Sequence, residues 1–271
     1  MTERYAAFDR LLFDHPAPHV LRVTINNPER MNALDAAGHR QMETIWAAID
    51  EDPEIRVSIV TGAGRGFSAG GSFDAMPLNS PLDPAQAFSK GFSDARNLVS
   101  GIINARKPIV SAINGPAVGA GLAIALLADV PIAAKDAKLL DGHLRLGVTP
   151  GDHAMMIWPL LCGMAKAKYF LMTNVALTGE EAERRGLVAL AVEAADLQAR
   201  AVEVASQLAE VAPTALRMTK YALNHWLRQN QPIFDLGLAF EMVNFSGGEA
   251  RRAMEAMTAK GVADFDGEVL F

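Results

Sequence analysis

The sequence predicts an α/β fold followed by a helical C-terminal portion, and three observations support this. Apolar runs of strand length alternate with segments of helical periodicity through roughly the first 190 residues. Helical periodicity alone continues after them. The 271 residues are 50% hydrophobic and 21% charged, which is typical of a globular chain with a substantial core. This composition excludes a disordered, collagen-like or coiled-coil protein.

The first half of the chain contains the predicted strands. Each is a short run of strand-forming residues that ends at a turn signal or in a glycine-rich loop. Between the strands, apolar residues recur at helical spacing, and Asp35 is a candidate N-cap for the first helix. The predicted strands are His19–Ile25, Val57–Thr61, Ile109–Ile113 and Val130–Ala133, and the predicted helices follow Asp35 and cover Gln86–Asn104 and Gly119–Ala128.

The second half is predicted to be mainly helical. Ala154–Thr173 has helical periodicity with a break at Gly163, and Thr178 with Glu181 forms a candidate capping box. Apolar residues then repeat at helical spacing from Leu197 to Val211. Further helices are predicted to open at Pro213 and from Ile233 onward.

Charge and cysteine content exclude several classes of protein. Twenty-five basic and 31 acidic residues give a net charge of −6, and no Lys/Arg-rich run indicates nucleic-acid binding. Met1–Arg10 lacks the apolar core of a secretory signal. Asp129 and Pro131 interrupt the most apolar stretch, which is too short to cross a bilayer. Cys162 has no partner for a disulfide, so we expect a cytoplasmic protein without membrane or nucleic-acid partners.

Two glycine-bearing segments are candidate functional sites. Gly64–Gly71 follows a predicted strand but lacks the residues of a phosphate-binding P-loop and the spacing of a dinucleotide motif; a flexible surface loop is the alternative. Asn114–Leu122 lies between a predicted strand and a predicted helix. The first amides of such a helix are unpaired and can bind an anion or an oxyanion, although a tight structural turn is equally consistent with small residues.

Several motifs in one order carry a family resemblance. They are Asn27–Leu34, Phe67–Gly71, Pro108–Gly121, Leu146–Gly151 and Thr178–Val188. In this order and spacing the chain resembles the crotonase superfamily, the enoyl-CoA hydratase/isomerases. The resemblance implies a crotonase-like spiral of ββα units over 1–195 and a helical C-terminal region, 196–271, used for trimerisation. It also implies a homotrimer or a dimer of trimers.

The same resemblance implies an enolate-stabilising enzyme. In the family, two backbone amides bind the enolate oxygen, usually that of a coenzyme A thioester, and here they map onto Gly71 and Ala120. No tightly bound cofactor or metal is implied, and coenzyme A would enter as part of the substrate. Its predicted contacts are Arg30, Ser68, Ala69, Gly71 and Lys107.

The chain departs from the family where hydratases carry two glutamates. Those positions hold Ala123 and His143, and Ser72 occupies the place of a common acidic residue. We therefore predict that His143 acts as general base and that Asp152 orients it or protonates the enolate. The alternative is a structural histidine and an Asp152 that caps the next helix.

A second resemblance concerns the acid–base residues. His143–Asp152 with Trp158–Leu160 is similar to the β-diketone hydrolase branch, typified by 6-oxocamphor hydrolase, which needs no coenzyme A. Leu236–Glu241 resembles the segment that supplies a further glutamate there, which makes Glu241 a third candidate. Phe73, Met76, Phe88 and Phe92 are candidate pocket residues.

Three hypotheses follow. The first is a hydratase/isomerase-like enzyme that acts on an acyl-CoA thioester with His143 and Asp152 in place of the usual glutamates. The second is hydrolytic cleavage of a carbon–carbon bond in a β-diketone. The third is a catalytically silent paralogue that serves as an assembly partner, since a fold alone does not determine function.

Overall fold

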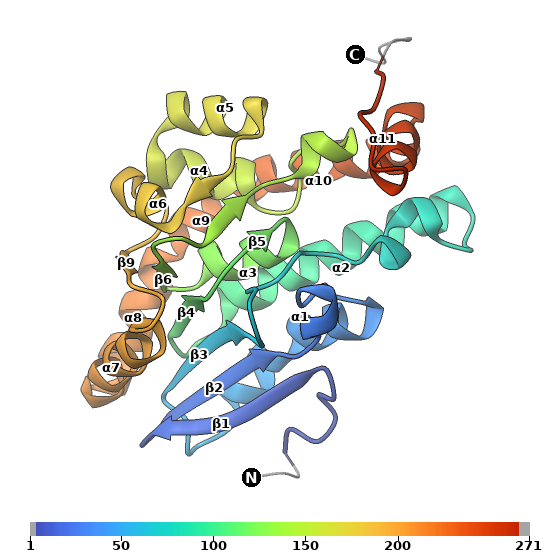
Figure 1. Ribbon diagram of the computed structural model, residues 1–271. Helices are drawn as coiled ribbons and strands as arrows, with labels where there is room; N and C mark the ends of the chain where they lie inside the picture. The colour runs from blue at the N-terminus through green and yellow to red at the C-terminus, as the bar shows by residue number, and fades with distance from the viewer. Residues whose placement is uncertain (1–3, 266–271) are drawn as a thin grey trace.

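A twisted six-stranded sheet forms the centre of the protein in the computed structural model, which describes residues 4–265 (Figure 1). The strand order is β1-β2-β3-β4-β6-β9; β1 pairs antiparallel with β2, and all other pairs are parallel. Parallel strands covered on both faces are apolar along their whole length, as in the runs that predicted them. The strands are β1 (Leu11–Ala17), β2 (Val20–Ile25), β3 (Val57–Gly62), β4 (Ile109–Ile113), β6 (Val130–Ala134) and β9 (Leu190–Val192).

A second, three-stranded sheet lies beside the first. Its order is β5-β7-β8, with β5 parallel to β7 and β8 antiparallel to it. This small sheet matters for the site, because β5 leads directly into the helix that starts at Ala120 and β7 leads to His143. The strands are β5 (Ala117–Val118), β7 (Lys138–Leu140) and β8 (Leu177–Thr178).

Helices cover both faces of the large sheet. Thr61 and Ser111 face opposite sides, because Ser111 pairs in register with Val60 and side chains alternate along a strand. Thr61 accepts a hydrogen bond from Gln198 of α7, whereas Ser111 donates one to Ala125 of α3. The core is therefore closed by α7 on one face and by α3, which packs against α2, on the other. The helices of the first half are α1 (Ala36–Asp50), α2 (Pro84–Asn104) and α3 (Ala120–Leu127), with 3-10 turns η1 (Pro28–Arg30), η2 (Phe73–Ala75) and η3 (Pro77–Asn79).

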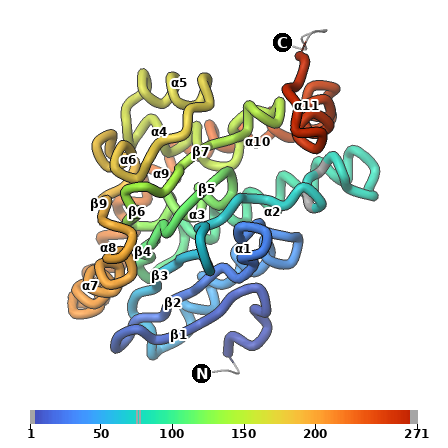
Figure 2. Tube along the Cα trace, viewed as in Figure 1, coloured from blue at the N-terminus to red at the C-terminus, as the bar shows by residue number. Residues whose placement is uncertain are grey.

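The remaining helices form the upper part of the molecule and its left flank in Figures 1 and 2. The chain passes from β1, near the N-terminal end, to α11 at the opposite end, where the C-terminal part lies. In chain order these elements are η4 (His143–Leu146), α4 (Ala154–Cys162), α5 (Met164–Thr173), α6 (Gly179–Arg185), α7 (Leu197–Glu210), α8 (Pro213–Leu223), α9 (His225–Gln229), α10 (Gln231–Phe245) and α11 (Gly248–Thr258).

The predicted α/β class and most of the predicted elements are confirmed. The Asp35 carboxylate caps α1 by accepting from the Gly38 amide at 2.7 Å, and Thr178 with Glu181 forms the capping box. Gly163, with φ of 79°, separates α4 from α5 as expected. The proposed boundary at residue 195 stays a prediction, and the ends of both parts, 1–3 and 266–271, lie outside the described residues.

Two differences concern the N-terminal hairpin. The predicted strand from His19 starts one residue later, because His19 has a φ of 62° and belongs to the turn. The sequence analysis missed β1 altogether. Asp14, His15 and Pro16 interrupt its apolar pattern, which an edge strand tolerates because one side of its backbone needs no partner.

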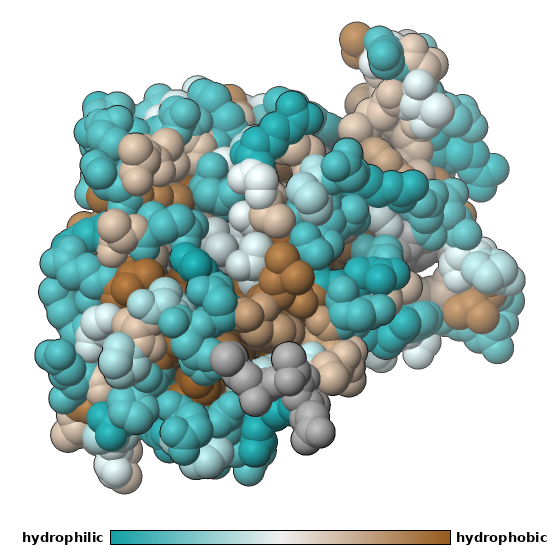
Figure 3. All heavy atoms as spheres, turned by 60° about the horizontal axis from the view of Figure 1, so that its bottom comes forward, coloured by the Kyte–Doolittle hydropathy of each residue, from teal (hydrophilic) through white to brown (hydrophobic). Residues whose placement is uncertain are grey.

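The surface is mostly hydrophilic, as the share of charged residues predicts. The face shown in Figure 3 is mostly hydrophilic, with small hydrophobic patches between the polar residues. Within residues 4–265, no helix is both long and apolar enough to cross a membrane. Large apolar side chains are exposed on helices of the C-terminal region: Met218, Tyr221 and Leu223 on α8, Trp226 on α9, and Ile233, Leu236, Phe240 and Val243 on α10.

A buried ion pair ties α8 to the sheet. Lys220 Nζ lies 2.7 Å from Asp129 Oδ2 and 3.0 Å from the carbonyl oxygen of Lys107. The same Asp129 oxygen accepts from the Ile109 amide at the start of β4. One lysine of the helical region therefore closes the turn between α3 and β6.

We expect Lys220→Met to lower the free energy of unfolding by about 3–5 kcal/mol, because it leaves the Asp129 carboxylate buried without its charged partner. Chemical denaturation measures this value. Lys135→Met is the matched control: Lys135 pairs with Glu193 on the surface, so the loss should be about 0–1 kcal/mol. Equal losses in the two variants would show that the buried pair has no special role.

Candidate active site

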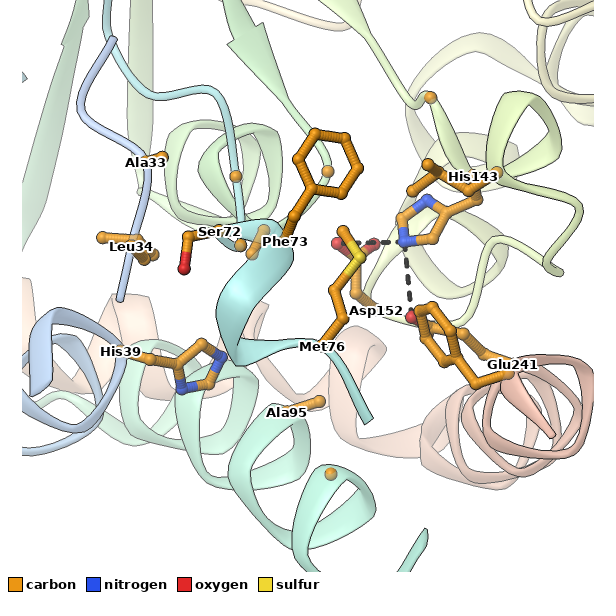
Figure 4. A pocket seen from close by; sticks show the side chains of 18 of the residues that line it. Ala33, Leu34, His39, Ser72, Phe73, Met76, Ala95, His143, Asp152 and Glu241 are labelled. Carbon is orange, nitrogen blue, oxygen red and sulfur yellow. Dashed lines mark ion pairs between the residues drawn. The ribbon is translucent and has the colours of Figure 1, made fainter. Parts of the chain in front are cut away.

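A cavity of about 850 Å³ opens between the two glycine segments, η4, α2 and α10. Figure 4 shows its two sides: His143, Asp152 and Glu241 converge on one wall, and His39 and Leu34 lie on the other. Apolar residues and glycines make up much of the remaining lining. Its members include Gly71, Phe73, Met76, Val118, Gly119, Ala120, Leu146, Met242 and Phe245.

The two glycine segments are joined to each other by backbone pairing. Ser68 forms a parallel bridge with Ala117, and Gly71 forms another with Leu34. A methyl group on Gly70, which has a φ of 84°, would lie 3.4 Å from the Ala120 nitrogen and only 2.7 Å from the Val118 oxygen. The Gly64–Gly71 segment is thus a packed element in which Gly66–Ser68 and Gly70 are buried, not the flexible surface loop that composition alone suggested.

Gly71 and Ala120, the two residues predicted to supply backbone amides, both line the cavity. In its bridge to Leu34, the backbone uses the Gly70 carbonyl and the Ser72 amide, which leaves the Gly71 amide on the opposite side. Ala120 is the first residue of α3, so its amide precedes the first intrahelical acceptor and lies at the positive end of the helix dipole. That these two amides bind one oxygen atom stays a prediction.

His143 forms the centre of a buried charged cluster. Its Nδ1 lies 3.1 Å from Asp141 Oδ2. Its Nε2 lies 3.6 Å from Asp152 Oδ2 and 3.6 Å from Glu241 Oε1. A methyl group on Gly119 would lie 3.8 Å from His143 Cε1, which puts the imidazole next to the residue that precedes the Ala120 amide. The structure therefore brings the three predicted acid–base residues together.

These surroundings shift the pKa values in opposite directions. Burial alone would lower the pKa of His143, but the three carboxyl groups around it raise that pKa well above 6.5. Burial, with the negative charge of Asp152, raises the pKa of Glu241 to about 8. Burial also acts to raise the pKa of Asp152, yet the charge of His143 and a hydrogen bond from His153 outweigh it, and the net shift is downward.

The role of His143 as general base stays a prediction. A general base has to be neutral, whereas the three carboxyl groups raise the pKa of His143 and so favour the imidazolium. The structural alternative for Asp152 is wrong: the N-cap of α4 is His153, and it makes no side-chain cap.

Two partners of the cluster were missed by the sequence analysis. Asp141 receives hydrogen bonds from both the backbone and Nδ1 of His143, across Gly142 with its φ of 89°. The short Asp-Gly-His spacing was the available signal. Nδ1 of His153 lies 2.6 Å from Asp152 Oδ1. The Asp-His sequence gave no signal for this contact, because it does not show which way either side chain points.

The predicted coenzyme A contacts fall into two groups. Ala69, Gly71 and the exposed Arg30, which pairs with Asp74 at 3.1 Å, line the cavity. Ser68 is buried and holds the loop by donating to the Asn32 carbonyl and accepting from the Gly70 amide. Lys107 is buried away from the cavity, and its ammonium donates to the carbonyls of Ile49 and Asp52. The structure therefore does not support a contact between Lys107 and coenzyme A.

The remaining candidate positions are also divided. Ala123 is fully buried in α3 and supplies no acid–base group. Phe73 and Met76 line the cavity as expected, but Phe88 and Phe92 lie outside the lining and stack on each other.

One group of side chains has metal-ligand spacing. Ligand atoms of Asp141, Asp152 and His153 lie within 4.8 Å of one another. However, Nε2 of His153 accepts a hydrogen bond from Trp158 and its Nδ1 binds Asp152, so His153 has no free lone pair for a metal. These residues do not fit a metal ion without losing both bonds.

Comparison with known proteins identifies the family. A family model described as enoyl-CoA hydratase/isomerase matches residues 17–266. The chain belongs to the enoyl-CoA hydratase/isomerase family. It is similar to a short-chain-enoyl-CoA hydratase of Clostridium acetobutylicum, with 33% identity over 88% of this chain and 90% of the relative. It is also similar to a 1,2-epoxyphenylacetyl-CoA isomerase of Escherichia coli, with 30% identity over 95% of this chain and 98% of the relative.

A solved structure confirms the crotonase-like fold of this family member. An enoyl-CoA hydratase/isomerase from Mycobacterium paratuberculosis superposes with a TM-score of 0.84 at 29% identity, over 91% of this chain and 97% of the other. The resemblance to the crotonase superfamily is thereby confirmed. The comparisons do not show the β-diketone hydrolase branch.

We expect Gly70→Ala to destabilise the protein strongly, because it adds the cost of a left-handed residue, about 1–2 kcal/mol, to a 2.7 Å clash with the Val118 carbonyl. Gly71→Ala is the matched control, since a methyl group there meets nothing within 4 Å. Thermal unfolding compares the two. A Gly71 variant as unstable as the Gly70 variant would contradict the packing described above.

The pKa shifts also predict how stability depends on pH. Between its ordinary 4.5 and about 8, folded Glu241 keeps a proton that the unfolded chain has lost, so stability falls as pH rises. The raised pKa of His143 acts in the same direction above pH 6.5, whereas the lowered pKa of Asp152 acts only in the acid range below 3.8.

We therefore expect the free energy of unfolding to decrease from about pH 5 to about pH 8, and Glu241→Gln to flatten this decrease. Urea denaturation at three pH values measures the slope. Glu255→Gln on α11, where the side chain is exposed, should leave the slope unchanged. An unaltered slope in the Glu241 variant would mean that this carboxyl ionises normally.

Proposed function

We propose that the chain catalyses acid–base chemistry next to the carbonyl of an acyl-CoA thioester, through an enolate bound by the amides of Gly71 and Ala120. The observation that carries the proposal is the convergence of Asp152 and Glu241 on Nε2 of His143, each at 3.6 Å, in the lining of the cavity. The pKa values of these two carboxyl groups shift in opposite directions. The family membership supports the thioester as substrate.

The opposite shifts assign the proton donor and the proton acceptor. Groups whose environments separate their pKa values serve as the acid and the base of a site. Asp152, with its lowered pKa, is ionised and accepts a proton. His143 is cationic and Glu241, with a pKa of about 8, is mostly protonated at neutral pH, so these two donate.

In hydration of an enoyl thioester, the steps balance as follows. Asp152 takes a proton from water while the hydroxyl oxygen bonds to Cβ and the Cα–Cβ double bond becomes the enolate. The enolate oxygen lies between the Gly71 and Ala120 amides. His143 or Glu241 then gives a proton to Cα. With His143 as donor, Asp152 Oδ2 returns its proton to Nε2 across 3.6 Å. With Glu241 as donor, the proton returns through His143, whose Nε2 lies 3.6 Å from both carboxyl groups. Isomerisation needs the same groups, with Asp152 taking its proton from carbon.

Arg30 is the candidate contact for the phosphates of coenzyme A. It is exposed, lines the cavity and pairs only with the exposed Asp74 among the described residues. A phosphate can replace that exposed carboxylate at little cost, because surface ion pairs are weak.

A second candidate is the hydrolysis of a β-diketone. The observation that favours it is the convergence of His143, Asp152 and Glu241, the set that the resemblance to that branch implies. A ketone oxygen in place of the thioester oxygen would use the same two amides. Coenzyme A would then make no contribution to binding.

We also propose that the exposed apolar side chains of α8, α9 and α10 are covered by further copies of the chain, as a homotrimer or a dimer of trimers. Trp226 is 62% exposed and Tyr221 66%. Exposed aromatic residues grouped on neighbouring helices are typical of a contact surface.

We expect the purified protein to turn over enoyl-CoA thioesters, and His143→Ala and Asp152→Asn each to lower kcat/KM by about 10²–10⁴. A spectrophotometric assay that follows the absorbance of the enoyl thioester measures kcat/KM for each protein. Arg30→Ala should raise KM with little change in kcat, since it touches the part of the substrate that does not react.

The controls separate the candidates. Coenzyme A should raise the melting temperature in the thioester case, because a ligand stabilises the folded state that binds it. No shift with coenzyme A, together with turnover of cyclic 1,3-diketones, would establish the second candidate instead. If no substrate is turned over and His143→Ala is indistinguishable from the unmodified protein, the third hypothesis remains, a catalytically silent paralogue that serves as an assembly partner.

A further inference from the structure

His153 occupies a fully buried position directly behind the candidate acceptor. It lies between Asp152 and α4 and is 1% exposed. Its Nδ1 lies 2.6 Å from Asp152 Oδ1, and its Nε2 lies 3.3 Å from the indole nitrogen of Trp158, which is itself buried. Neither residue lines the cavity, so neither can touch a substrate there.

We propose that His153 is a positioning residue, held neutral by Trp158, that keeps Asp152 ionised and presents a single carboxylate oxygen to His143. The geometry is the evidence for this role. The part in which Asp152 accepts a proton rests on the proposed function.

The chemistry of the indole determines the charge state of His153. An indole N–H can only donate, so Nε2 of His153 must be the acceptor and carries no hydrogen. The imidazole hydrogen is therefore on Nδ1, where it donates to Asp152 Oδ1. A second proton on His153 would point two donors at each other across 3.3 Å, so Trp158 keeps this histidine neutral.

The hydrogen bond from His153 divides the carboxylate of Asp152 into two different oxygens. Oδ1 is occupied by His153. Oδ2 is buried, has no hydrogen-bond partner among residues 4–265, and lies 3.6 Å from His143 Nε2. The oxygen left for proton exchange is thus the one on the cavity side.

Burial and two histidines act on Asp152. Burial favours its protonated form, whereas His143 from η4 and His153 favour the ionised form, and the net shift of its pKa is downward. Glu241 from α10 and Asp141 from the loop after β7 complete the surroundings of the cluster. The hydrogen bond from His153 stabilises the carboxylate. Removing that bond while Asp152 stays buried must shift it toward its protonated form.

The test compares His153→Leu with His153→Asn, whose side chains have the same branched skeleton of heavy atoms. The asparagine amide can donate to Asp152 from about the place of Nδ1, whereas leucine cannot. Carbon-13 NMR of the Asp152 carboxyl gives its titration directly. We expect the leucine variant to titrate about one to two pH units higher than the unmodified protein, and the asparagine variant to stay close to it.

The acid limb of kcat/KM against pH should move by the same amount in the leucine variant and be restored in the asparagine variant. A purely structural role would change stability and leave this limb in place. Identical Asp152 titrations in all three proteins would overturn the proposal. A titration that moves as expected in a protein without thioester turnover would support the role of His153 and reject the proposed function.

A measurement on the unmodified protein covers the case in which the leucine variant does not fold. Nitrogen-15 NMR at neutral pH should show the imidazole hydrogen of His153 on Nδ1, because the indole N–H of Trp158 donates to Nε2. In Trp158→Phe an aromatic ring is kept and the donor is lost, so hydrogen on Nε2 should become detectable. Hydrogen on Nε2 in the unmodified protein would overturn the proposal.

Discussion

The structure of this site depends on the burial of one imidazole among three carboxyl groups. Each group would lose hydration if it were buried alone, and isolated buried charges are too costly to persist. The cluster avoids that cost by sharing charge: His143 is held cationic, Asp152 remains anionic and Glu241 retains its proton. The fold serves this balance, because the four groups come from the β7–η4 segment, the start of α4 and the middle of α10.

The backbone around the cluster is constrained in the same region. Gly70, Gly119 and Gly142 all have positive φ, and each lies where a side chain would meet backbone or a member of the site. The bridges Ser68–Ala117 and Leu34–Gly71 hold the two glycine segments against each other. The two glycine segments and a charged cluster thus line one cavity, although they come from distant parts of the chain. An α/β core with parallel strands favours this meeting, since its loops converge at one edge.

The sequence predicted the parts of the fold that local chemistry specifies. Asp35, Gly163 and the Thr178–Glu181 pair act within a few residues, and all three predictions are confirmed. The direction of a side chain is a tertiary property, so Lys107 was predicted to contact a ligand although its ammonium turns inward to carbonyls. The raised pKa of His143 could not be predicted for the same reason. A sequence does not show that Asp141, Asp152 and Glu241 surround one imidazole, and those contacts decide its pKa.

A cationic His143 changes what this wall of the cavity contributes to an enolate mechanism. Two neutral amides stabilise a developing oxyanion through fixed dipoles. In the proposed mechanism the imidazolium of His143 lies in the same cavity lining, with its charge shared by Asp141 and Asp152, and burial makes such interactions stronger than in bulk solvent. Because the imidazole lies next to Gly119, its charge acts near the Ala120 amide even before any proton moves. In the proposed mechanism, Ala123 and His143 stand at the positions where the resemblance places two glutamates. Asp152 and Glu241, which come from other elements of the fold, then serve as proton acceptor and donor.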